Sequence, residues 1–188
     1  MEVCMQTNNR FFQSMLLYTV FIFYIFLVLH IILFKSTSPL ELFGNRRAML
    51  RSANLVPFST INGYFYGHFD VSKSISFKNI VGNIILFVPL GIYLPLFRLQ
   101  KKDRIHLFYI STISLSLELI QYIFYIGTFD IDDILLNSLG GFIGILLYKL
   151  LAFIIKDAKK IRHFITIISS AVGLLLFGLM LLLYISSF

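Results

Sequence analysis

The sequence predicts an all-α, polytopic integral membrane protein with five transmembrane helices and one long extracellular loop after the first helix. Three observations support this fold class. Of the 188 residues, 58% are hydrophobic and 13% are charged. The mean hydropathy is +0.86, far from the balance of soluble domains. Five apolar segments reach the roughly 20 residues that a helix needs to cross a hydrocarbon core: Phe11–Phe34, Ile80–Phe97, Ile105–Ile126, Ile134–Ile155 and Phe164–Ser186.

The first apolar segment, Phe11–Phe34, is expected to be a retained helix and not a secretory signal. Its apolar run is too long for a signal peptide, and Arg10 is the only positive charge before it. No small-residue cleavage pattern follows it. The second segment, Ile80–Phe97, is the shortest and contains Pro89 and Pro95, so its ends are the hardest to place.

The fourth segment carries a strip of glycines. Gly140, Gly141 and Gly144 share one side of an ideal helix, and Gly140 and Gly144 form a small-xxx-small pattern. This pattern predicts that another helix approaches closely. We expect all five helices to form a single domain over residues 1–188.

The loop Lys35–Lys78 is the only substantial segment predicted to lie outside the membrane. It is too apolar for a flexible linker, and short elements are expected at Leu40–Phe43 and Leu55–Phe58. The aromatic residues of Tyr64–Phe69 suit the headgroup region. We expect a partly ordered cap over the outer mouth of the helices. An interfacial loop without contact to the pocket is the alternative.

The distribution of basic residues predicts the orientation. The connections Arg98–Arg104 and Lys156–His163 each carry four Lys or Arg residues, whereas Gly127–Asp133 carries none and has three aspartates. The two basic connections and the N-terminus are therefore predicted to be cytoplasmic, and the C-terminus extracellular. The formal charge of +7 then arises on the cytoplasmic face, where the Lys156–Arg162 run would touch anionic headgroups. This topology accounts for the charge, and no nucleic-acid partner is predicted.

Polar side chains in the membrane segments fall toward one end of the predicted bundle. Such groups are costly in lipid and usually face a cavity or a partner. In an up-and-down bundle they lie at one depth, and the faces of three helices can converge there. The residues are Asn79, Asn83, Glu118, Gln121, Asp130, Asp132, Asp133 and Asn137. The sequence therefore predicts a polar pocket that opens on the outer membrane face.

Several of these residues also have a structural explanation. Asp130 or Asp132 would suit the N-terminus of the fourth helix as a cap. Asn83, Gln121 and Asn137 would suit hydrogen bonds between helices. The sequence leaves these alternatives open.

Glu118 is the residue least easily explained as structural. A carboxylate at its depth must be protonated, paired with a cation or exposed to water in a cavity. Pairing with Arg46, Arg47 or Arg51 is the structural alternative to a functional role.

The sequence predicts no metal site and leaves any cofactor open. Cys4 is the only cysteine, which excludes an intramolecular disulfide and a metal site built from cysteines. A hard cation such as Mg²⁺ or Ca²⁺ would suit a set of oxygen ligands. However, the spacing of the carboxylates is not that of a recognised metal loop.

Four sequence runs occur in a fixed order along the middle of the chain. They are Arg51–Phe58 (RSANLVPF), Asn83–Gly91 (NIILFVPLG), Glu118–Gln121 (ELIQ) and Asp130–Gly141 (DIDDILLNSLGG). With these runs the chain resembles the VanZ-like family of small bacterial membrane proteins, over about Arg51 to Tyr148. The resemblance implies a role in the bacterial cell envelope, at the plasma membrane, and low-level resistance to teicoplanin-type glycopeptides. It implies no established biochemical activity.

The resemblance also implies a set of characteristic positions. These are Arg51, Asn54, Pro57, Asn83, Pro89, Glu118, Gln121, Asp133 and Asn137. Many members of the family carry an arginine just before the aspartate run, where this chain has Gly127–Phe129. A counter-ion for the aspartates must therefore come from elsewhere, such as Arg51.

Two functions fit the predicted pocket. In the first, an outer-leaflet enzyme acts on a membrane lipid or a lipid-linked, peptidoglycan-related precursor, and Glu118 and Asp133 supply acid/base catalysis. The substrate-binding residues would be Arg51, Asn54, Asn83, Gln121, Asp130, Asp132 and Asn137. In the second, the pocket binds a glycopeptide, a lipid precursor or a wall-synthesis protein without turnover. A small conduit is less favoured, because no charged residue continues the polar path into the cytoplasmic half.

Overall fold

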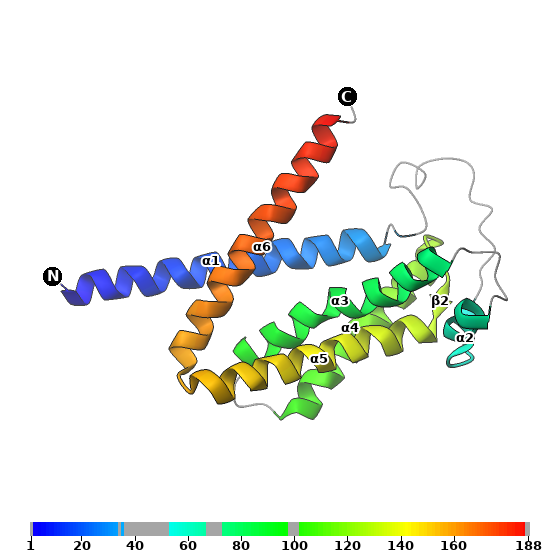
Figure 1. The fold of residues 1–188 in the computed structure, drawn as a ribbon, viewed down its shortest axis with the longest axis horizontal. Coiled ribbons are helices and arrows are strands. Elements are labelled where there is room, and N and C mark those ends of the chain that lie inside the picture. The colour runs from blue at the N-terminus through cyan, green and yellow to red at the C-terminus, as the bar shows by residue number, and fades with distance from the viewer. Residues whose placement is uncertain (1, 34, 36–52, 67–72, 98–101, 187–188) are drawn as a thin grey trace. The chain divides into compact units, whose positions relative to one another are not determined.

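Five long helices dominate the structure, a computed structural model that describes residues 2–33, 35, 53–66, 73–97 and 102–186 (Figure 1). The helices are α1 (Glu2–Leu33), α2 (Ser59–Tyr66), α3 (Lys73–Phe97), α4 (Asp103–Phe124), α5 (Ile131–Ile155) and α6 (Ala158–Ser186). Two short strands, β1 (Ala53–Asn54) and β2 (Phe129–Asp130), complete the set of described elements.

Five of the described helices are long and apolar enough to cross a membrane. The spans are Phe11–Leu33, Phe77–Phe97, Asp103–Phe124, Ile131–Ile155 and Ala158–Ser186. The predicted fold class, an all-α polytopic membrane protein with five spanning helices, is therefore confirmed. Helix α3 begins at Lys73, before the predicted Ile80, and continues through Pro89 and Pro95.

Strand β1 and helix α2, which lie in the connection before α3, were not predicted. Residues Leu55–Phe58, expected to form a short element, lie between β1 and the short helix α2. Strand β1 pairs in parallel with β2, so that Ala53 lies opposite Phe129 and Asn54 opposite Asp130. The short element expected at Leu40–Phe43 lies outside the described residues.

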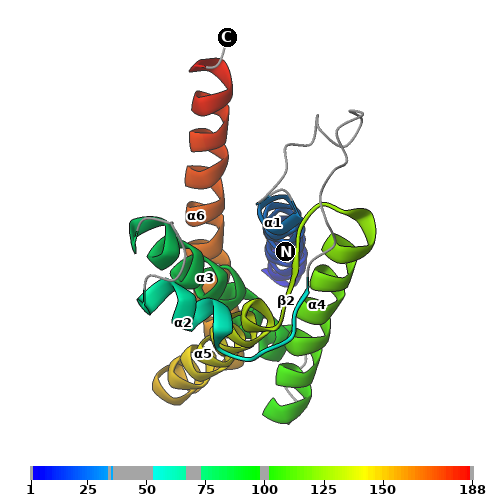
Figure 2. The same cartoon turned by 90° about the vertical axis from the view of Figure 1, so that its right-hand side faces the viewer.

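The chain divides into two compact units. The terminal unit comprises Met1–Leu29 and Leu151–Phe188, and the central unit comprises His30–Leu150. Within the central unit, α2 and β2 lie at the end where α5 begins, and Figure 2 shows this end from the front. The expectation of a single domain stays a prediction.

Glycines let α3 and α5 touch backbone to backbone in the central unit. A Cβ atom on Gly140 would stand 2.1 Å from the carbonyl oxygen of Ile84, and one on Gly144 would stand 2.1 Å from that of Val88. A Cβ atom on Gly91 would stand 2.1 Å from the carbonyl oxygen of Gly141. Only residues without a side chain permit such contacts. The close helix approach predicted from the glycine strip is therefore confirmed.

Candidate functional site

Four carboxylates gather where α4 ends and α5 begins, and we call them the carboxylate cluster: Glu118, Asp130, Asp132 and Asp133. Glu118 is 1% exposed and Asp132 is fully buried. Buried acidic groups need hydrogen bonds or opposite charges. Their partners therefore show what each carboxylate does in the fold.

Asp132 holds the start of α2. Its Oδ1 atom accepts a hydrogen bond from the backbone N–H of Phe58 at 2.5 Å. Its Oδ2 atom accepts from the backbone N–H groups of Thr60 and Ile61, at 2.9 and 3.1 Å. The first N–H groups of a helix have no partner within the helix, and an anion at that end is favourable. Asp132 thus caps α2 from a segment distant in the sequence.

Asp130 is the residue directly before α5, and its Oδ1 atom accepts a hydrogen bond from the backbone N–H of Asp132 at 2.9 Å. This is the bonding pattern of an N-cap. The same carboxylate also accepts from Asn54 Nδ2 at 3.2 Å and from Thr60 Oγ1 at 2.7 Å. The capping alternative for one of the two aspartates is therefore confirmed for Asp130. Its bonds also tie β1 and α2 to the start of α5.

Glu118 reaches from α4 to β2. Its Oε2 atom accepts a hydrogen bond from the backbone N–H of Asp130 at 2.9 Å. Glu118 also lies within electrostatic range of Lys35 and Asp133. The arginines considered as its structural partners, Arg46, Arg47 and Arg51, all lie outside the described residues.

Asp133 is the carboxylate of the cluster that carries an ion pair among the described residues. Its Oδ2 atom lies 3.0 Å from Lys35 Nζ, and its Oδ1 atom accepts a hydrogen bond from Asn83 Nδ2 at 2.5 Å. The side chains of Lys35 and Asp133 are 32% and 17% exposed. This pair is therefore partly accessible to an external molecule.

Lys35 was not predicted as a site residue. The sequence suggested Arg51 as the counter-ion of the aspartates. The position of Lys35 in the sequence could have identified it, because Lys35 is the first basic residue after the first spanning helix. That position brings it to the membrane end where the polar residues gather. Arg51 itself lies outside the described residues.

Gln121 and Asn137 form hydrogen bonds between helices, as their structural alternative predicted. Gln121 Nε2 donates to the carbonyl oxygen of Ile32 at 2.9 Å, near the C-terminus of α1. Asn137 Nδ2 donates to Ser114 Oγ at 2.9 Å and joins α5 to α4. Asn137 is 2% exposed, and its Oδ1 atom has no hydrogen-bond partner among the described atoms.

Asn54 and Asn83 both donate to the carboxylate cluster. Asn54 also accepts hydrogen bonds, from Ser59 Oγ at 2.7 Å and from the backbone N–H of Val56 at 3.3 Å. The fold thus brings Asn54 and Asn83 together with the four carboxylates. Gln121 and Asn137 bond instead to Ile32 and Ser114, and Arg51 lies outside the described residues. The described residues hold no group of three or more His, Cys, Asp or Glu side chains arranged to bind a metal ion.

Comparisons with known proteins agree with the sequence motifs. The family model VanZ/LLP1 matches residues 21–156, a span that includes Lys35 and the carboxylate cluster. Protein VanZ of Enterococcus faecium is 30% identical over 128 residues, which cover 68% of this chain and 70% of that protein. No solved structure matches the chain. The chain belongs to the VanZ/LLP1 family.

Proposed function

We propose that this protein is a multi-pass protein of a bacterial plasma membrane that modulates low-level resistance to teicoplanin-type glycopeptides. Its carboxylate cluster would act on, or bind, an envelope lipid or a lipid-linked peptidoglycan precursor. Membership of the VanZ/LLP1 family and the similarity to protein VanZ support the resistance role. The geometry around Asp133 supports the choice of site.

The observation that carries the proposed chemistry is the partly exposed Lys35–Asp133 ion pair beside the buried Glu118. An anionic headgroup that binds Lys35 would compete with Asp133 and release its carboxylate. Asp133 would then be placed to take a proton from the bound molecule, and Glu118 to exchange one as the second acid/base group. Both carboxylates are within electrostatic range of the same lysine.

The other residues of the site would position these groups. Asn83 donates to Asp133 and would orient its carboxylate. Asp130 and Asp132 accept several hydrogen bonds each, mainly from the chain around α2. Those bonds favour positioning roles for the two aspartates. Arg51 and Asn54 would contribute to binding of the anionic headgroup, and Gln121 and Asn137 would line the deeper part of the site.

The test of this proposal is resistance in living cells. Glu118→Gln and Asp133→Asn each remove a charge while keeping the shape of the side chain. At matched expression, both variants should lose the teicoplanin resistance of the wild type. Asp103→Asn is the matched control, because Asp103 begins α4, far along the helix from Glu118, and pairs with Lys149. Retained resistance in both site variants would eliminate the proposed roles.

A non-catalytic binding function is the second candidate. It is favoured by the number of fold-stabilising bonds that occupy Asp130 and Asp132, which leaves few groups free for chemistry. A test for turnover of a lipid substrate distinguishes the enzymatic function from the binding function. Purified protein incubated with a bacterial lipid extract should give a changed product if it is an enzyme, and saturable binding alone if it is not.

The proposed site requires that the carboxylate cluster face the outside, with the N-terminus in the cytoplasm. The single cysteine of the chain gives an internal reference for this topology. In Thr128→Cys protein, an impermeant thiol reagent added to intact cells should label position 128 but leave Cys4 unlabelled until the membrane is opened. Labelling of Cys4 alone in intact cells would reverse the orientation.

A further inference from the structure

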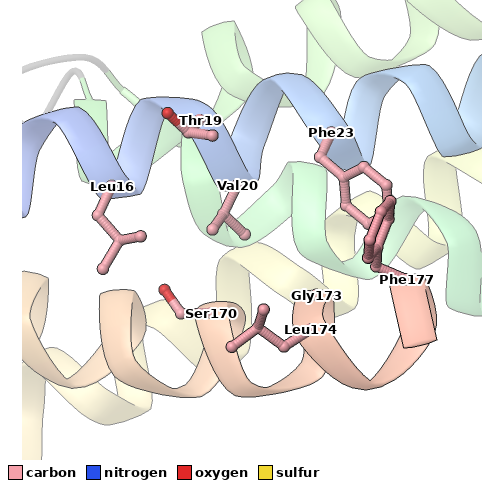
Figure 3. A pocket seen from close by; sticks show the side chains of 8 residues that line it. All are labelled: Leu16, Thr19, Val20, Phe23, Ser170, Gly173, Leu174 and Phe177. Carbon is pink, nitrogen blue, oxygen red and sulfur yellow. The ribbon is translucent and has the colours of Figure 1, made fainter.

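The terminal unit contains an apolar groove that the proposed function does not use. It has a volume of about 270 Å³ and lies between α1 and α6 (Figure 3). Its lining residues are Leu16, Thr19, Val20 and Phe23 from α1, and Ser170, Gly173, Leu174 and Phe177 from α6. In Figure 3 Leu16, Val20 and Phe23 point from α1 toward α6, and the side chains of Ser170, Leu174 and Phe177 point back toward α1.

The two helices touch on either side of this groove. On one side, Arg162 Nη2 donates to Ser14 Oγ at 3.3 Å, and Gln13 and His163 are joined by a hydrogen bond of 3.0 Å. On the other side, the rings of Phe23 and Phe177 meet edge to face, with centroids 6.1 Å apart. The groove lies along the length between these contacts, where a Cβ atom on Gly173 would stand 3.5 Å from Val20. In a membrane such a space does not stay empty, because its walls would lose their packing contacts.

Basic side chains gather at the polar end of the groove, where α6 begins. Lys156, Lys159, Lys160 and His163 are exposed, and Arg162 is half-buried. Within the described residues, none of them forms an ion pair with a carboxylate. Asp157, the acidic residue of this corner, accepts hydrogen bonds from the backbone N–H groups of Lys159 and Lys160. The corner therefore presents a net positive charge suited to a phosphate.

The distance between the basic corner and the groove matches the anatomy of a phospholipid. At 1.5 Å per residue, Ser170 lies about 12 Å along α6 from Arg162. Half of a hydrocarbon core is about 15 Å thick. A headgroup bound at Arg162 would therefore place an acyl chain at the depth of the groove. Ser170, at this depth, adds a buried hydroxyl that has no hydrogen-bond partner among the described atoms.

We infer that the groove between α1 and α6 binds one acyl chain of an anionic phospholipid whose headgroup lies on the basic corner around Arg162. The charge of the corner selects the headgroup, and the apolar walls select the chain. This lipid site is independent of the carboxylate cluster, because all of its residues belong to the terminal unit. It would hold a resident lipid whether or not the cluster acts on another one.

Two glycines of α6 allow a matched test. A Cβ atom on Gly173 would come no closer than 3.5 Å to Val20, so Gly173→Leu can place its side chain in the groove without a backbone clash. A Cβ atom on Gly178 would meet nothing within 4 Å, and Gly178 does not line the groove. Gly178→Leu therefore makes the same change on the same helix outside the site.

The experiment is native mass spectrometry of the full-length protein from nanodiscs of phosphatidylglycerol and phosphatidylcholine in equal amounts. The wild type should retain one phosphatidylglycerol per chain, with at least a tenfold preference over phosphatidylcholine. Gly173→Leu should lose this lipid, and Gly178→Leu should keep it. The double variant Lys159→Gln/Arg162→Gln should lose the preference. Circular dichroism and gel filtration would verify that each variant is folded.

Three outcomes would overturn the inference. Equal retention of the two lipids by the wild type would show that charge does not select the occupant. Equal lipid loss from Gly173→Leu and Gly178→Leu would show that the groove is not the site. A lipid-free dimer that Gly173→Leu dissociates would assign the groove to a second copy of the chain.

Discussion

Glu118, in the last turns of α4, accepts a hydrogen bond from the backbone N–H of Asp130 at 2.9 Å. The bond joins the side chain of one spanning helix to the strand residue that leads into the next. Asp130 in turn caps α5 and accepts a hydrogen bond from Asn54. A single carboxylate from α4 therefore helps to position the whole carboxylate cluster.

Two substitutions can distinguish the contribution of this hydrogen bond from the contribution of the charge of Glu118. In Glu118→Gln the side-chain oxygen can still accept from Asp130, so we expect the variant to unfold close to the wild-type temperature. In Glu118→Leu the backbone N–H of Asp130 is left without its acceptor, and stability should fall by about 1–3 kcal/mol. Thermal unfolding in detergent measures both. Equal destabilisation by Gln and Leu would show that the charge, and not the hydrogen bond, holds this corner.

Asp132 should be the most sensitive cap among the described helices. Asp132→Ala removes the acceptor of three backbone N–H groups at the start of α2, and we expect a loss of about 3 kcal/mol or more. Hydrogen exchange at the amides of Thr60 and Ile61 should accelerate. Asp157→Ala provides the control, because Asp157 caps α6 in a more exposed position and should cost about 1 kcal/mol. Unchanged exchange in α2 would refute the capping role.

The pair Lys35–Asp133 should contribute measurable coupling energy because it is partly buried. We expect about 1 kcal/mol from a double-mutant cycle with Lys35→Gln and Asp133→Asn. The pair Lys149–Asp103 serves for comparison, since its side chains are 54% and 49% exposed. Its cycle should give less than about 0.5 kcal/mol. Similar values for the two pairs would mean that burial does not strengthen the Lys35–Asp133 contact.

The glycine contact between α3 and α5 should tolerate no added methyl group. Gly91→Ala would place a Cβ atom 2.1 Å from a backbone oxygen of α5, and overpacking of this kind should cost about 3 kcal/mol or more. Gly82→Ala, on the same helix, meets nothing within 4 Å. It should be neutral or stabilise α3 by up to about 1 kcal/mol. Thermal unfolding of both variants gives the comparison, and equal midpoints would contradict the close helix approach.

The spanning helices and the glycine contact were predictable because their signals are local. An apolar run of the right length predicts a helix across the membrane wherever it occurs. The spacing of Gly140 and Gly144 likewise predicts one smooth helix face. The clustering of Glu118, Asn83 and Asp133 at one end also followed from helix order and helix length alone.

The partners of the polar groups could not be predicted in this way. Asp132 binds Thr60, 72 residues away, and Asp133 binds Lys35, 98 residues away. No local pattern reveals such pairs, because the geometry of a hydrogen bond depends on where two distant backbones are placed. Strand β1 and helix α2 were missed for the same reason, since each is held by contacts with β2 and the start of α5.

The sequence by itself determined that the chain crosses the membrane, which segments cross it and at which end the carboxylates gather, because hydropathy and helical periodicity are properties of each segment alone. Only the tertiary structure decided which carboxylate caps a helix and which one meets a lysine at the exposed edge. Most buried polar groups need a hydrogen-bond partner, and the fold alone determines which partner is within reach.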